Sequence, residues 1–203
     1  MATGTLRDAF VDELKDSYDG EKQLIKALKK MAKAAKADEL RTAFETHLEE
    51  TQGQVQRLEQ VFELLDEKVK GKHCDGLAGI IEEGSSVMEE DFDDATMNAC
   101  LIASGQRAEH YEMAAYGTLV AWARVLGEDE AADLLQQTLD EEKAADEKLS
   151  ALAEGGINEE AASPGTDDEE ADDASSSPSK PRKAAVMPRK SNTAPGRAAR
   201  PRA

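Results

Sequence analysis

The distribution of proline restricts this chain more than any other feature of its sequence. All six prolines lie between Pro164 and Pro201, so the whole sequence before Gly155 lacks the residue that most strongly breaks helices. Apolar residues recur there at helical spacing, beginning with Leu6, Phe10 and Leu14. We therefore predict an all-α domain over residues 5–154, followed by a tail of different character over 155–203.

The apolar stripes predict four long helices, at about 6–35, 38–66, 93–126 and 129–154. Thr5 and Asp38 are candidate N-caps, and Gly127 stands where a glycine stop belongs. At 1.5 Å rise per residue the helices are roughly 40 to 50 Å long and closely matched. The short connections make two antiparallel hairpins, whereas 67–92 is long enough for an end-to-end crossover with a short helix at 76–90. This pattern is typical of a four-helix bundle.

Composition restricts the possible partners. The net charge of -18 should repel nucleic acid and anionic membranes over most of the surface. No apolar run approaches the roughly 18 residues that span a bilayer, and the first residues lack a signal-peptide pattern, so we expect a cytoplasmic protein without membrane contact. Cys74 and Cys100 have no metal-site spacing, and we expect them to be reduced packing residues.

Several acidic residues fall inside the apolar stripes, where an unpartnered carboxylate costs several kcal/mol. Each helix supplies at least one glutamate near its middle, and antiparallel packing brings helix midpoints together. Facing carboxylates of this kind are typical of di-iron and di-manganese proteins. The alternative is chance placement in an acidic chain, with Lys or Arg neutralising each acid. The candidates are Glu21, Glu50, Glu109, Glu112 and Glu142, with Tyr18 and Tyr116 placed either to bond a ligand carboxylate or only to pack.

Four segments carry a family resemblance, namely 19–24 (DGEKQL), 47–55 (HLEETQGQV), 108–118 (AEHYEMAAYGT) and 138–143 (TLDEEK). They resemble the YciF family of bacterial stress proteins, which belongs to the ferritin-like superfamily. The resemblance covers roughly residues 6–152 and implies a ferritin-like four-helix bundle with two iron or manganese ions. It implies that Glu21, Glu50, Glu109 and Glu142 are the four carboxylate ligands, and that Glu112 matches an extra glutamate of rubrerythrin-like members.

The histidines depart from the superfamily pattern, in which a histidine follows two of the glutamates by three residues. Gly53 and Ala145 stand at those positions. His47 and His110 lie near Glu50 and Glu109, and each either reaches a metal from another direction or serves only in packing or at the surface. A site rich in carboxylates and poor in nitrogen favours iron or manganese over zinc or copper.

Two functions from different classes follow. The first is a stress-associated protein that binds two metal ions and consumes oxidants or oxidises iron, because the sequence shows no phosphate loop, nucleophile triad or zinc knuckle. No catalytic residue is identified beyond the metal ligands. The alternative is a metal-free helical scaffold that binds a partner under stress. We expect a homodimer in either case.

The tail separates its charges into two blocks. Residues 158–173 hold eight acids and no base, and residues 174–203 hold eight bases and no acid. Proline, serine, glycine and alanine dominate without apolar periodicity, so we expect disorder. The basic block predicts weak, salt-sensitive DNA contact that is indifferent to sequence. An intramolecular contact with the acidic block is the alternative.

Overall fold

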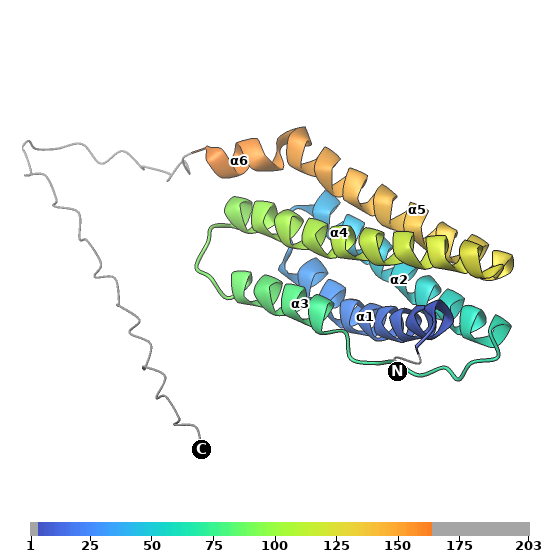
Figure 1. Cartoon of the computed structure of the whole chain (residues 1–203). Coiled ribbons are helices and arrows are strands. Elements are labelled where there is room, and N and C mark those ends of the chain that lie inside the picture. The colour runs from blue at the N-terminus through green and yellow to red at the C-terminus, as the bar shows by residue number, and fades with distance from the viewer. Residues whose placement is uncertain (1–3, 164–203) are drawn as a thin grey trace, which may run out of the picture. The chain divides into compact units, whose positions relative to one another are not determined.

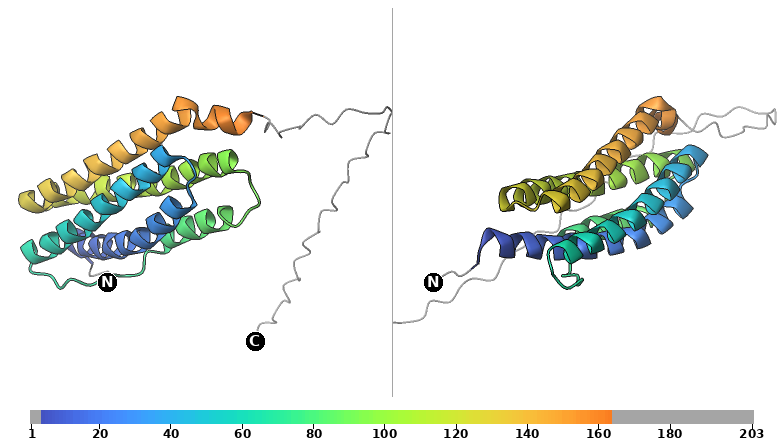
Figure 2. Two further views of the ribbon diagram at one scale, coloured as in Figure 1. Left: turned by 180° about the vertical axis from the view of Figure 1, so that it is seen from behind. Right: turned by 90° about the vertical axis from the view of Figure 1, so that its right-hand side faces the viewer.

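The computed structural model describes residues 4–163, and in that range the chain is a bundle of long helices without strands (Figure 1). Helices α1 (Leu6–Ala34) and α2 (Asp38–Leu64) form one antiparallel hairpin, and α4 (Asp94–Leu126) and α5 (Asp129–Leu152) form the other. The hairpins pack with α1 against α4 and α2 against α5, as the two views in Figure 2 show. The predicted all-α four-helix bundle is confirmed.

The long connection returns along the bundle before α4 begins. Its helix α3 (Asp75–Val87) packs on α1 and α4. The Cys74 thiol caps α3 by accepting the Leu77 N–H at 3.4 Å. The long crossover makes α2 and α4 run in the same direction, as the sequence predicts, and it contains the expected short helix.

Helix ends follow from local chemistry. Thr5 and Asp8 form a reciprocal capping box at the start of α1, and Asp93 accepts the Thr96 N–H at 2.7 Å at the start of α4. Gly127 ends α4 in the left-handed region at φ 77°. An L-residue with a Cβ is strained there, so the tight turn into α5 depends on glycine.

Two expectations about helix ends differ from the structure. Asp38 is not an N-cap but the first residue of α2, and its carboxylate accepts from the Arg41 guanidinium at 2.7 Å instead of from the backbone. The helical region also extends past Glu154, through a wide turn at Ala153–Ile157 into the short helix α6 (Asn158–Ala162). Gly156 takes up the kink at φ 135°, and the half-buried Ile157 packs on the core. The rest of the predicted tail, with the basic block and its DNA contact, lies outside the described residues.

The apolar core consists of two separate halves. One half lies toward the start of α1 and includes Phe10, Leu58, Leu119 and Leu135. The other lies toward the end of α1 and includes Leu28, Leu40, Leu101 and Leu149. The polar candidates lie between the halves on every long helix. Over residues 4–163, no helix combines the length and the apolar character that crossing a membrane requires.

Replacement of Gly127 tests the account of the α4 end. Gly127→Ala should lower the free energy of unfolding by about 1 kcal/mol, because alanine is strained at positive φ. The matched control is Gly117→Ala inside α4, where an added Cβ meets nothing within 4 Å. That change should raise the free energy of unfolding by about 1 kcal/mol, the gain in helix propensity. Denaturant titration measures both, and equal shifts of the same sign would contradict the account.

Candidate metal centre

The layer between the two apolar halves is built from glutamates that the sequence places on the inner face of three helices. Glu21 comes from α1, Glu109 and Glu112 come from α4 one turn apart, and Glu142 comes from α5. None of the four is more than 4% exposed. Ionised carboxylates are almost never this buried without a partner.

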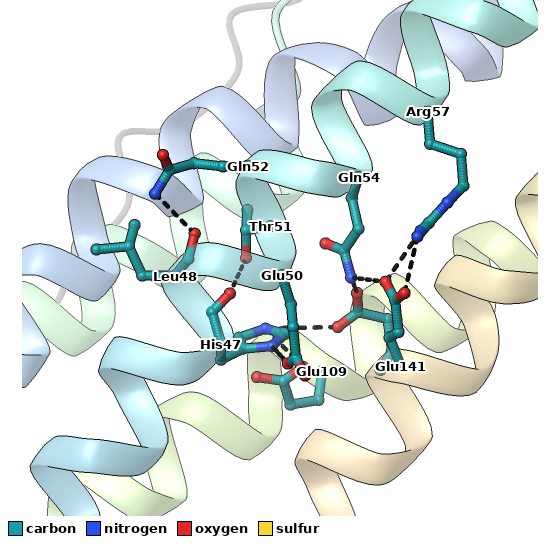
Figure 3. Close-up of polar contacts among 10 residues, drawn as sticks. His47, Leu48, Glu50, Thr51, Gln52, Gln54, Arg57, Glu109 and Glu141 are labelled. Atoms are coloured by element: carbon teal, nitrogen blue, oxygen red, sulfur yellow. Dashed lines mark hydrogen bonds and ion pairs between the residues drawn. The ribbon is translucent and has the colours of Figure 1, made fainter.

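One histidine joins this layer from the fourth helix. His47 on α2 is 5% exposed, and its Nε2 atom lies 3.4 Å from Glu109 Oε2 and 3.5 Å from Glu142 Oε2. One potential ligand atom from each of His47, Glu109, Glu112 and Glu142 lies within 4.8 Å of the others. We call these four residues the metal cluster. Figure 3 shows His47 and Glu109 facing one another across the space between their helices.

Glu50 is on the outer side of His47. Its Oε2 atom is 3.3 Å from His47 Nδ1, and its side chain is 41% exposed. The two nitrogens of the His47 ring therefore face different acids, one toward solvent and one toward the buried layer. A carboxylate on one ring nitrogen commonly orients a histidine whose other nitrogen binds metal.

Glu21 lies at the edge of the cluster. Its Oε1 atom accepts a short hydrogen bond from the hydroxyl of Tyr116, which is itself 1% exposed. Tyr116 therefore bonds a candidate ligand carboxylate, the first of its two predicted roles, and also packs in the core. Tyr18, the other candidate, donates instead to Glu59 at 2.8 Å and so does not reach the cluster.

A second group of residues holds Glu142 in place. The fully buried Gln54 side chain donates to Glu142 Oε1 at 2.5 Å and to Glu141 Oε2 at 3.1 Å. Arg57 binds both oxygens of Glu141, at 2.9 and 2.7 Å, as Figure 3 shows. Hydrogen bonds such as that from Gln54 to Glu142 fix the direction of metal ligands.

The inner atoms of this layer lack partners. Seven buried side-chain atoms make no hydrogen bond among the residues that the structure describes. Two are Ser17 Oγ and Gln54 Oε1, and the other five belong to this layer: Glu21 Oε2, His47 Nε2, Glu109 Oε2, Glu112 Oε2 and Glu142 Oε2. Leaving buried polar atoms unpaired costs free energy, and native proteins rarely do so. Four carboxylates and one imidazole that share this deficiency fit a bound cation.

The electrostatics lead to the same conclusion. Burial, followed by repulsion from neighbouring glutamates, raises the pKa of Glu21 and of Glu112 well above the usual range. Burial together with the contact to Glu142 likewise raises the pKa of Glu109. Burial also raises the pKa of Glu142, against the opposing effect of His47. A cation in the layer would reverse these shifts, because it favours the ionised carboxylate.

The structure separates the sequence candidates. Glu109, Glu112, Glu142 and His47 come together, Glu21 lies beside them, and Glu50 contacts His47 from the solvent side. His110 is not in the cluster. It is 67% exposed and its Nε2 atom lies 3.3 Å from Asp146 Oδ1. The reason is helical geometry, because the residue after Glu109 is turned by about 100° around α4 and so points outward.

Sequence reasoning did not single out Arg57, whose partners Thr138 and Glu141 are on another helix. The one available signal is its spacing, because Arg57 lies three residues after Gln54 and so shares its edge of α2. Gln54 is a second supporting residue, because it bonds both Glu141 and Glu142.

The raised carboxyl pKa values predict how the metal-free protein responds to pH. A carboxyl with a higher pKa in the folded chain binds its proton more tightly there, so its contribution to stability is complete below the unfolded value of 4.5. That contribution is lost as the pH rises through the folded value. After chelator treatment, unfolding should therefore become easier as the pH rises above about 5. Glu112→Gln should weaken this dependence, and the exposed control Glu45→Gln should not. A Glu112→Gln protein with the unchanged pH profile would contradict the assignment.

Comparison with known proteins gives a family for this fold and layer. The model of a family described as a domain of unknown function (DUF892) matches residues 5–162. Protein YciF of Escherichia coli K12 is 46% identical over 162 residues, which make up 79% of this chain and 98% of YciF. The family resemblance read from the sequence motifs is therefore confirmed.

Solved structures agree. The crystal structure of the E. coli stress protein YciF matches with a TM-score of 0.74 and 45% identity, over 77% of this chain and 99% of that chain. YcfI, described as a putative structural protein from Rhodopseudomonas palustris, matches with a TM-score of 0.71 and 42% identity. The match covers 72% of this chain and 94% of that chain. A protein from Xanthomonas campestris matches with a TM-score of 0.59 and 25% identity, over 77% of this chain and 99% of that chain. The chain belongs to the DUF892 family and is a YciF-like member of it, consistent with the ferritin-like superfamily.

Proposed function

We propose that the protein binds two divalent metal ions, iron or manganese, in the buried layer. The supporting observation is the set of five unpartnered polar atoms in that layer, together with the close grouping of His47, Glu109, Glu112 and Glu142. His47, Glu109, Glu112 and Glu142 would hold one ion, and Glu21 would help to hold the second. Glu50 would orient His47 from the solvent side or add an oxygen.

Charge supports a pair of ions. The four buried glutamates of the layer carry four negative charges when all are ionised. Two divalent cations balance them completely, whereas one leaves two charges unpaired in a water-poor interior. The donor set favours hard cations that also accept imidazole, because the layer offers carboxylate oxygens and one ring nitrogen and no thiolate.

The proposed role is in the stress response, as an oxidant-consuming or iron-oxidising protein. A relative that is 46% identical is the E. coli protein YciF, which is described as a stress protein. Bound iron or manganese would supply the change of oxidation state that no protein side chain in the layer supplies. The chain's own residues hold the ions, exclude water with the apolar halves, and keep Glu142 and His47 oriented through Gln54 and Glu50.

Metal titration with matched histidine variants tests the proposal. Purified without chelator, the chain should hold two ions, and adding Mn(II) to stripped protein at 100 times the dissociation constant should stabilise it by about 2.7 kcal/mol for each ion bound. His47→Asn and Glu142→Gln should each reduce the bound metal by at least one ion per chain. His110→Asn is the control, because its exposed ring lies outside the cluster.

Elemental analysis and thermal unfolding measure these effects. The proposal would be contradicted if the melting temperature of the stripped protein did not rise with Fe(II) or Mn(II) and if the variants kept their metal content. That result would support the alternative of a metal-free scaffold, in which Glu142→Gln raises stability by removing a buried acid.

A further inference from the structure

A groove reaches the metal cluster from the surface, and most of its lining residues lie outside that cluster. It has a volume of about 640 Å³ and lies between α2 and α5, and its inner end reaches Glu109 on α4. Buried side chains form its floor, namely Phe44, His47, Glu109 and Leu149. Its mouth is formed by exposed residues of the first turns of α2 and by Lys148 of α5.

The groove is open because its walls are made of small residues. Ala43 faces it from α2, and Ala144 and Ala145 face it from α5. Ala145 stands where the superfamily pattern would place a bulky imidazole. The volume is far larger than the roughly 30 Å³ that one water occupies, so the groove exceeds what a small oxidant needs. It falls in the range of about 300 to 1,000 Å³ that is usual for pockets that bind organic molecules.

The polar groups of the groove select the charge of its ligand. Glu50 and the exposed Glu39 face it with one cation, Lys148, while the carboxylate of Asp38 is paired with Arg41 at 2.7 Å. The Glu50 side chain is 41% exposed, so it is a lining carboxylate that lies outside the buried layer. The whole chain carries a charge of -18. An anion is therefore repelled, and a ligand must bring hydrogen-bond donors to Glu50.

From these observations we infer that the groove binds a small organic amine, with its apolar body between Phe44 and the alanines and its ammonium group against Glu50. Apolar walls with a few convergent polar groups are the usual composition of a small-molecule site. The ammonium donates to the Glu50 carboxylate, and its charge complements the acids of the groove. The inference goes beyond metal binding, because Glu50 and the walls face the groove whether or not ions occupy the layer.

Three ring compounds of nearly equal size test the charge and donor preference. Calorimetric titration of the full chain, both as purified and after chelator treatment, should show binding in the order benzylamine, benzyl alcohol, benzoate, with benzoate below detection. Glu50→Gln should weaken the binding of benzylamine by about tenfold, since it removes one charge-assisted hydrogen bond. The same change should leave benzyl alcohol nearly unaffected.

A wall substitution tests the location. Ala144→Phe fills the groove from an exposed position and should abolish binding of both benzylamine and benzyl alcohol, whereas Ala103→Phe, on an exposed face of α4 away from the groove, should leave both unchanged. Equal binding of benzoate and benzylamine, or benzylamine binding that survives Ala144→Phe, would overturn the inference. If benzylamine does not bind but the metal content is normal, the metal proposal stands and the amine inference fails. If the metal content is lost but benzylamine still binds, the amine inference stands and the metal proposal fails.

Discussion

The mutual repulsion of four buried glutamates is the constraint on which this structure depends. Glu21, Glu109, Glu112 and Glu142 occupy one layer at 4% exposure or less. Burial raises the pKa of each, and the neighbouring glutamates raise the pKa of Glu21, Glu109 and Glu112 further. A chain without cations in this layer can fold only with protons on some of these groups. The arrangement therefore costs stability at neutral pH unless something positive occupies the layer, and that is the physical basis for a metal site.

The rest of the fold holds this layer at the middle of the bundle. Antiparallel hairpins align the helix midpoints, and the crossover through α3 sets the order in which the helices meet. Two apolar halves then close the layer from both ends, with Phe62 and Leu119 on one side and Leu28 and Leu101 on the other. Packing of this kind keeps water from the ligand atoms, which strengthens every charge interaction between them. The groove between α2 and α5 is where this enclosure is incomplete.

The sequence predicts the parts that depend on a single helix. Periodicity and missing prolines predict the four helices, and the position of each glutamate within a stripe predicts the buried layer. The contacts between helices are less predictable. Whether His47 at the edge of its stripe turns inward depends on how α2 rotates against α5, and the Arg57 to Glu141 pair depends on both helices. Helix spacing alone could have placed His110 outside, since it follows an inward Glu109 directly.

The helix ends show the same distinction. Gly127 ends α4 as expected. The positive φ at this position depends on the residue itself and not on contacts with other helices, so it can be predicted from the local sequence. Helical structure past Glu154 was not expected, because Gly155 and Gly156 disfavour a helix locally. The half-buried Ile157, which packs on the core, outweighs that preference.

Anomalous X-ray scattering from crystals grown with Mn(II) tests the central claim most directly. The account predicts two manganese peaks in the buried layer, separated by about 3.5 to 4 Å, with His47, Glu109, Glu112 and Glu142 as ligands of one or both and Glu21 at the second. Peaks confined to exposed acids, with the buried layer empty at saturating Mn(II), would contradict it.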